Sequence, residues 1–250
     1  MMLWTSYTWT QVGWGLLLGL VLCELNLYLT TAVLHRGLCH GAITYPSWVK
    51  RGVAIWLWAT GCIPTLSWIA AHLHHHARSD TRDDPHAPSV KGFWRVTLLT
   101  WYYVPAWSRS HRDFARMRYL KAFEGERLLH VLDHSLVANL NFYGQLVVSV
   151  VLGPPAIAFW LARIGPYVAL SGYVNAVAHT FGKRPYDNLG TDADGAVQTV
   201  MGYLVGGETL GHNYHHRHPG NARFRPNARD PGFSFATTVL RGNPVQRRVS

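Results

Sequence analysis

The sequence lacks any cysteine pattern that would cross-link the chain or bind zinc. Its three cysteines, Cys23, Cys39 and Cys62, show neither CxxC nor paired spacing, so neither a disulfide framework nor a cysteine-based zinc site is predicted. The chain also contains no tract that reads as a linker, an internal repeat or a low-complexity segment. We therefore expect one domain that covers residues 1–250.

Charge is missing from several long stretches. No Asp, Glu, Lys or Arg occurs in residues 52–71, 135–162 or 164–182, and residues 14–34 carry only Glu24. A bilayer core of roughly 30 Å needs about 20 apolar helical residues, so all four stretches are candidates to enter a membrane. Residues 1–34 contain no Lys or Arg, unlike a cleaved signal peptide, so we expect the stretch 14–34 to be a retained helix.

Acidic residues are scarce, with 13 Asp and Glu against 23 Lys and Arg, and the formal net charge is +10. The basic residues interleave with the apolar stretches and match no nucleic-acid-binding motif, so nucleic acid is not a predicted partner. The excess of basic residues instead favours a surface that meets anionic lipid headgroups, or an acidic ligand such as a thioester-activated acyl carrier.

Histidine, in contrast, is abundant, with 15 residues. Most fall in three short boxes, HRGLCH at 35–40, HLHHH at 72–76 and HNYHH at 212–216, while His179 stands alone in NAVAH. A helix turns about 100° per residue, so in HxxHH the outer histidines share a face and the middle one lies within about 60° of the first. One box is therefore expected to aim three imidazoles at one place.

Two HxxHH boxes, the HxxxxH box and His179 supply nine imidazoles. These are too many for one metal ion of coordination number four to six, but they suit two. An all-histidine set of this size disfavours a structural zinc site, and the Glu-rich motifs of soluble di-iron bundles are scarce here. The prediction is a histidine-rich di-iron centre. Five of the other six histidines, at 74, 111, 130, 134 and 218, are predicted to have ordinary core or surface roles.

The arrangement resembles the membrane fatty acid desaturases, and more closely their acyl-CoA (stearoyl-CoA-like) branch. HRGLCH, SWIAAHLHHHARSDTRDDPH and GETLGHNYHH resemble the family's three boxes in order, and NAVAHTFGKRPYD resembles a segment that carries one more His ligand and an Asn. The resemblance implies iron ligands at His35, His40, His72, His75, His76, His179, His212, His215 and His216.

The resemblance also implies that Asn175 holds a metal through water. Asn175 and His179 are four residues apart and would face the same side of one helix. Asp84 and His86, in the DPH segment, are candidates to orient ligands, although a plain turn role for Asp-Pro is an equal alternative. Trp56, Trp58 and Trp68 are candidates to line a substrate channel, or else face the core or the membrane.

All the ligands must meet on one side of the membrane, so residues about 52–71 cannot simply cross it. An interfacial or re-entrant segment, interrupted at Pro64, is expected instead. The predicted spans are residues about 12–34, 141–161 and 164–181, with a kink at Pro154 and Pro155 and with Arg163 in the turn on the far side.

Residues 72–135 and 183–250 are expected to form a helical cap that holds the metal site. The fold class is therefore an all-α integral membrane protein with about three spanning helices, an interfacial or re-entrant helix and this cap. No Lys or Arg precedes His35, and only Arg163 falls in the expected far-side turn. By the positive-inside rule the histidine side is the cytoplasm.

The function implied by the resemblance is an oxygen-dependent fatty acyl desaturase with two iron ions as cofactor. Its expected substrate is an acyl thioester, carried on CoA or another carrier, and an acyl chain in a phospholipid stays open as an alternative. Electrons are expected from a separate protein of the ferredoxin or cytochrome b5 type with its reductase. A fatty acyl hydroxylase or acetylenase with the same site remains an alternative. A more remote one is a membrane protein that binds metal without redox chemistry.

Overall fold

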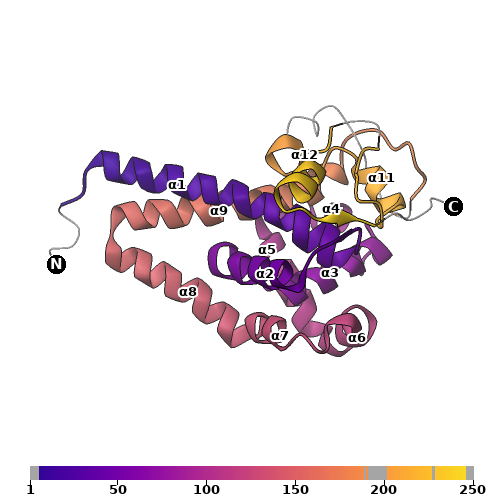
Figure 1. The fold of residues 1–250 in the computed structure, drawn as a ribbon, viewed down its shortest axis with the longest axis horizontal. Helices are drawn as coiled ribbons and strands as arrows, with labels where there is room; N and C mark the ends of the chain where they lie inside the picture. The colour runs from indigo at the N-terminus through magenta and orange to yellow at the C-terminus, as the bar shows by residue number, and fades with distance from the viewer. Residues whose placement is uncertain (1–5, 189, 191–201, 227–228, 246–250) are drawn as a thin grey trace.

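The computed structural model describes residues 6–188, 190, 202–226 and 229–245, and these are mostly helical (Figure 1). The helices are α1 (Trp9–Leu29), α2 (Ser47–Gly61), α3 (Thr65–Arg78), α4 (Pro88–Lys91), α5 (Phe93–Ser110), α6 (Arg112–Arg118), α7 (Arg127–Asp133), α8 (Ser135–Leu152), α9 (Pro154–Ala178), α11 (His212–Arg217) and α12 (Pro231–Ser234). Two π-helices, η1 (Thr30–Cys39) and η3 (Phe235–Val239), the 3-10 helix η2 (Lys121–Phe123) and the strands β1 (Ile43–Thr44) and β2 (Asn243–Pro244) complete the described elements.

Among the described residues, three helices are long and apolar enough to span a membrane: the continuous α1–η1 helix, α8 and α9. The first begins where Thr8 and Gln11 form a capping box. It packs along α9 because two glycines let the backbones approach closely: a Cβ at Gly15 would lie 2.3 Å from the Pro155 carbonyl oxygen, and one at Gly19 would lie 2.5 Å from that of Phe159. The prediction of an all-α membrane fold with about three spans is confirmed.

The apolar stretch 52–71 forms parts of two helices rather than one. α2 and α3 meet at an angle of 96°, and the break lies at Cys62 to Pro64, where Cys62 has a positive φ of 55°. Pro64 lacks a backbone N–H and precedes the first residue of α3. The predicted interruption at Pro64 therefore corresponds to this bend, which turns the chain so that α3 brings the second histidine box to the other boxes.

The hairpin between α8 and α9 differs from the expected one. The helices were predicted at about 141–161 and 164–181, with Arg163 in the turn, but the turn lies at Gly153, which has a φ of +90°. Pro154 opens α9 instead of kinking a helix, because a proline at the first position loses no helical hydrogen bond. Arg163 consequently lies inside α9, where it is 6% exposed.

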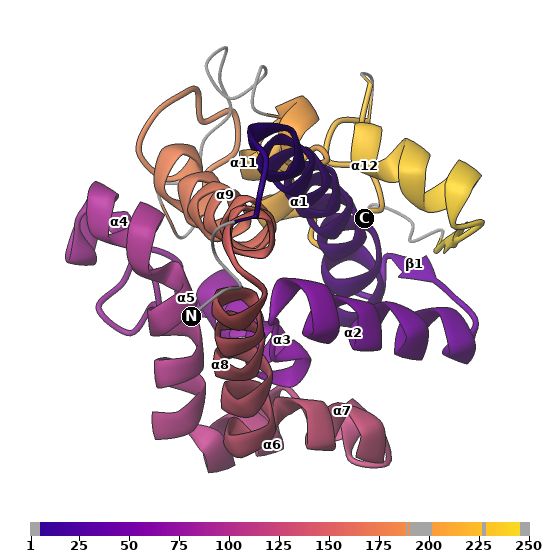
Figure 2. The ribbon, with the colours of Figure 1, turned by 90° about the vertical axis from the view of Figure 1, so that its left-hand side faces the viewer.

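The remaining helices form a cap at one end of the spans. Figure 1 shows α3, α4, α11 and α12 toward the end opposite the α8–α9 turn, and Figure 2 shows α5, α6 and α7 on the same side of α9 as α8. The C-terminal part is tied back by β2, which pairs antiparallel with β1. Buried Arg36 of η1 donates to both oxygens of Asp230, which in turn caps α12. These contacts anchor the loops around the histidine boxes.

Candidate metal centre

The first histidine cluster contains His35, His40, His72, His76 and His215, whose ligand atoms lie within 4.8 Å of one another. His35 and His40 are five residues apart, a spacing that would separate them on a regular α-helix. His35 lies in η1 and His40 caps its C-terminus, where the His40 N–H donates to the His35 carbonyl over 3.0 Å. This i to i+5 winding places residues five apart over one another, and the two ring centroids are 4.8 Å apart.

The second histidine cluster contains His75, His179, His212 and His216. Each HxxHH box is thus divided between the clusters. The outer pair of a box stays together, as His72 with His76 and as His212 with His216, while the middle histidine joins the other cluster. The expectation that one box aims all three imidazoles at one place was therefore wrong, because the two histidines that are adjacent in sequence point about 100° apart.

Carboxylates fix the orientation of several imidazole rings through their Nδ1 atoms. His35 Nδ1 lies 2.8 Å from Glu208 Oε1, His75 Nδ1 lies 2.8 Å from Asp84 Oδ2, and His179 Nδ1 lies 2.7 Å from Asp80 Oδ2. In addition, His212 Nδ1 lies 3.1 Å from the carbonyl oxygen of Glu208. Because these partners only accept hydrogen bonds, each Nδ1 carries the proton, and the lone pair of each neutral ring is on Nε2.

Within each cluster, Nε2 atoms of neighbouring imidazole rings point at one another. His179 Nε2 is 2.9 Å from His212 Nε2, and His35 Nε2 is 3.0 Å from His215 Nε2. The first of these contacts joins two lone pairs, so it is not a hydrogen bond and a cation is needed to stabilise it. Two nitrogens bound at right angles to one metal at about 2.1 Å lie about 3 Å apart. The donor set therefore fits a metal ion in each cluster.

Burial keeps the α11 imidazoles in the form that binds metal. Desolvation, reinforced by the neighbouring imidazoles, holds the pKa of His212, His215 and His216 well below the usual value. Burial alone would raise the pKa of Glu208, but His35 and Arg36 beside it lower that pKa below its usual value. Neutral imidazoles backed by ionised carboxylates are the arrangement typical of metal-bound histidine.

The segment after α3 supplies a third group, His75, Asp84 and His86. Burial raises the pKa of Asp84 and His75 lowers it, with a net shift well below the usual range. Asp84 also accepts the backbone N–H groups of Asp80 and His86 over 2.8 and 2.9 Å. Asp84 therefore both orients a histidine and builds a turn, while the role of His86 in orienting a ligand stays a prediction. Burial, with His75 second, lowers the pKa of His86 to about 3.

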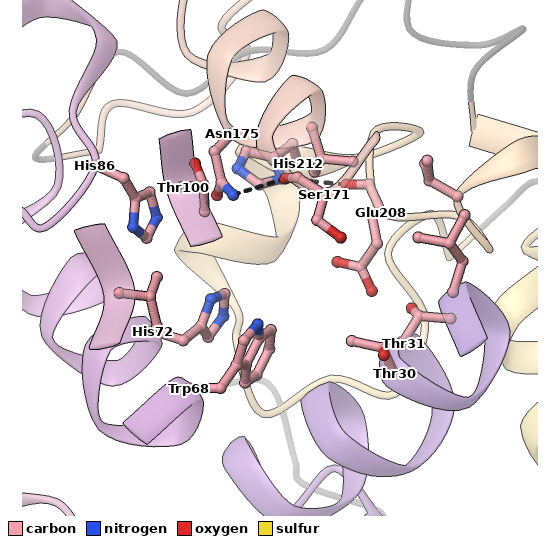
Figure 3. A pocket seen from close by; sticks show the side chains of 14 residues that line it. Thr30, Thr31, Trp68, His72, His86, Thr100, Ser171, Asn175, Glu208 and His212 are labelled. Carbon is pink, nitrogen blue, oxygen red and sulfur yellow. Dashed lines mark hydrogen bonds between the residues drawn. The ribbon is translucent and has the colours of Figure 1, made fainter. Parts of the chain in front are cut away.

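A cavity of about 70 Å³ adjoins both clusters and runs between α1–η1, α3, α5 and α9. This is the space of two or three water molecules. Figure 3 shows His72, His86, His212 and Glu208 around it, with Trp68 beside His72. The remaining side chains that line it are mostly aliphatic or small and polar: Leu27, Thr30, Thr31, Thr100, Val104, Ser171, Val174, Asn175 and Val205.

Trp68 is the one of the three candidate tryptophans that lines this cavity, and its ring stacks on His72 with centroids 4.8 Å apart. Trp56 instead donates to Asn26 on α1. Asn175 also lines the cavity, and its side-chain amide donates to the Ser171 carbonyl over 3.0 Å. Its role at a metal stays a prediction.

All nine histidines predicted as ligands lie in the two clusters. The five histidines that were predicted to have ordinary roles lie elsewhere among the described residues: His74, for example, contacts the Tyr119 hydroxyl and stacks on Trp107. The sequence analysis missed Glu208 and Asp80. Glu208 precedes His212 by four residues and Asp80 follows His76 by four, so a carboxylate one turn from a box was the available signal.

These features define the class: a helical membrane protein whose histidine clusters are suited to a metal centre. The chain belongs to the fatty acid desaturase family, whose family model matches residues 7–225. The resemblance drawn from the histidine boxes is thereby confirmed.

Among curated proteins, the chain is 29% identical over 204 residues to delta-9 acyl-lipid desaturase 1 of Arabidopsis thaliana, covering 77% of this chain and 61% of that protein. It is 28% identical over 223 residues to sn-1 stearoyl-lipid 9-desaturase of Anabaena variabilis, covering 88% and 76%. It is 23% identical over 201 residues to hex-5-enoyl-(acyl-carrier protein) acetylenase of Moorena producens, covering 73% and 60%. The chain thus spans only about 60% of the length of two of these three relatives.

Proposed function

We propose that this protein is an oxygen-dependent fatty acyl desaturase that introduces a C=C bond at a histidine-ligated di-iron centre. The observation that carries the proposal is the pair of clusters whose Nε2 atoms converge at 2.9 to 3.2 Å beside a mostly apolar cavity. When bound, two irons would supply the oxidising chemistry by which an acyl chain, dioxygen, two electrons and two protons give an alkene and two waters.

The protein's own residues hold the rings and position the chain. Glu208, Asp80 and Asp84 keep the Nδ1 protons of three of the proposed ligands in place, so that each Nε2 lone pair faces its cluster. Trp68, Val104 and Val174 line the cavity and would hold methylene groups near the metal site while excluding water. Because the cavity is small, a long acyl chain must open it further when it binds.

The orientation in the membrane is part of the proposal. No Lys or Arg precedes Arg36 in the sequence, and none lies at the far-side turn of Leu152, Gly153 and Pro154. By the positive-inside rule, the histidine clusters face the cytoplasm. Acyl thioesters and soluble electron carriers are both found on that side, so we retain an acyl thioester as substrate and a ferredoxin-type or cytochrome b5-type protein as electron donor.

Expression in a desaturase-deficient host tests the function, with double-bond positions in the lipids determined by mass spectrometry. The wild-type chain should produce an unsaturated acyl product. His40→Ala, in the first cluster, should abolish it because one of five converging imidazoles is lost. His134→Ala removes an exposed histidine outside the clusters and should leave the product unchanged. Full product formation by His40→Ala would contradict the site assignment.

A second reaction of the same site is favoured by one comparison. The relative from Moorena producens is named an acetylenase, and an acetylenase removes two hydrogens from a substrate that already has a double bond. The same lipid analysis distinguishes the reactions, since a triple bond lowers the product mass by two more hydrogens and a hydroxylase product gains one oxygen. Oxygen uptake with an added electron donor separates all of these from a protein that only binds metal.

A further inference from the structure

A second cavity, of about 580 Å³, lies between α8 and α9. It shares no lining residue with the cavity at the histidine clusters. Figure 1 shows α8 diverging from α9 after the turn, and the cavity walls include the apolar side chains of Leu140, Val148 and Leu152. These three side chains are at least half exposed, and α8 is a candidate span. The cavity is therefore a groove on the surface that lipid chains would cover.

The groove contains one charged side chain, Arg163 of α9. Arg163 lies nine residues after Pro154 and sixteen before His179, or about 14 Å and about 24 Å along the helix axis. It is only 6% exposed, and no ion pair joins it to a carboxylate in the described part of the chain. An intramembrane charge of this kind normally has a partner.

The guanidinium retains unused hydrogen-bond donors. Its Nη2 donates to Gln145 Oε1 of α8, whereas its Nε has no acceptor. The indole N–H of Trp160, which lines the same groove, also has no acceptor among the described residues. A donor left without an acceptor in an apolar environment is unfavourable, because it has lost the hydrogen bonds that water would make. The groove thus combines a positive charge with spare donors and supplies no anion.

Two side chains of α8 near Arg163 donate to backbone carbonyls close to the C-terminal end of α2. The Asn141 amide donates to the Trp58 carbonyl over 2.6 Å, and the Gln145 amide donates to the Ala59 carbonyl over 2.7 Å. The C-terminus of a helix carries about half a negative charge, which offsets only part of the Arg163 charge. Gln145 is held so that its oxygen meets Arg163, and the guanidinium carbon lies 5.1 Å from the centroid of the Phe159 ring. These contacts leave the Nε donor of Arg163 for another group.

We propose that this groove binds the anionic group of an amphiphile, either the phosphate of a phospholipid or the carboxylate of a fatty acid. The anion pairs with Arg163 and accepts from Trp160, while the hydrocarbon chain lies along Leu140, Val148 and Leu152. A neutral polar molecule would leave the charge of Arg163 uncompensated, and a soluble anion would not match the apolar walls. This site is separate from the proposed catalytic function, and its test does not depend on activity.

Native mass spectrometry of the full chain, purified with its metal in detergent, measures the binding. The probes are phosphatidylglycerol, oleate and phosphatidylcholine as the reference without net charge. We expect the wild type to prefer at least one of the two anions by about tenfold or more. One charge-assisted hydrogen bond contributes a free energy similar to that of a tenfold change in affinity. Preference for phosphatidylglycerol alone assigns a phosphate, and preference for oleate alone assigns a carboxylate.

Three variants and one control decide the assignment. Arg163→Gln should lose the preference for the anion, Arg163→Lys should keep part of it, and Trp160→Phe should lower the affinity while retaining the ring. Arg95→Gln removes an exposed charge on α5 and should bind as the wild type does, which controls for the overall positive charge.

Metal content and melting temperature show whether each variant is folded. If Arg163→Gln does not fold, the Lys and Phe variants carry the test. Wild-type binding without preference for either anion, or an unchanged preference in all folded variants of Arg163 and Trp160, would overturn the proposal.

Discussion

Replacing Glu208 with Gln tests whether a carboxylate outside the clusters controls metal binding. Glu208 Oε2 lies 2.7 Å and Oε1 2.8 Å from His35 Nδ1, and Arg36 Nη1 is 3.7 Å from Oε1. A Gln side chain keeps the shape and can still accept from His35, but it removes the negative charge. A hydrogen bond to a charged group is worth about 1 kcal/mol more than a neutral one, which corresponds to roughly fivefold in affinity.

Changes to groups that hold metal-bound histidines typically weaken metal affinity by about 10- to 100-fold. We therefore expect the loss of metal affinity to lie near the lower end of this range for Glu208→Gln and near the upper end for Glu208→Ala. Competition with a graded series of chelators, read out as iron per chain, measures the affinity. Glu126→Gln is the matched control, since it removes a carboxylate paired with Arg51 at the surface, where their side chains are 33% and 53% exposed. Glu208→Gln that retains iron as strongly as Glu126→Gln would refute the reasoning.

Three further predictions concern the second cluster, the packing of the spans and pH. Asp84→Asn should release metal more readily than the wild type because Asp84 orients His75, whereas the exposed neighbour Asp83→Asn should not; equal retention would contradict this. Gly172→Ala should lower the melting temperature in detergent by several degrees, because its Cβ would lie 2.2 Å from the Thr97 carbonyl oxygen on α5. Gly165 lies on the same helix, and a Cβ there would have nothing within 4 Å, so Gly165→Ala should be neutral or slightly stabilising. The metal-free protein should lose stability as the pH falls below about 6.5. Burial lowers the pKa of the three α11 histidines in the folded protein, so the unfolded chain binds more protons in this pH range. A melting temperature that stays constant or rises between pH 7 and 5 would be inconsistent with this.

The grouping of the outer histidines of each HxxHH box was predictable, because spacing on a single helix is a local property. His72 and His76, or His212 and His216, share a face on any helix, and the apolar stretches predict spans by composition alone. The location of the α8–α9 turn was not predictable in the same way. Both Gly153 and Arg163 interrupt the apolar residues, and only the burial of Arg163 between α8 and α9 places the turn at Gly153.

By itself, then, the sequence determined which residues can bind metal and that the chain enters a membrane, because both depend on residue type and on spacing within single helices. The tertiary structure decided how the nine histidines divide into groups of five and four. It also decided that π-helical winding brings His35 and His40 together, and that Glu208 and Asp80 hold rings far from them in sequence. These depend on how separate helices pack, which local spacing does not specify.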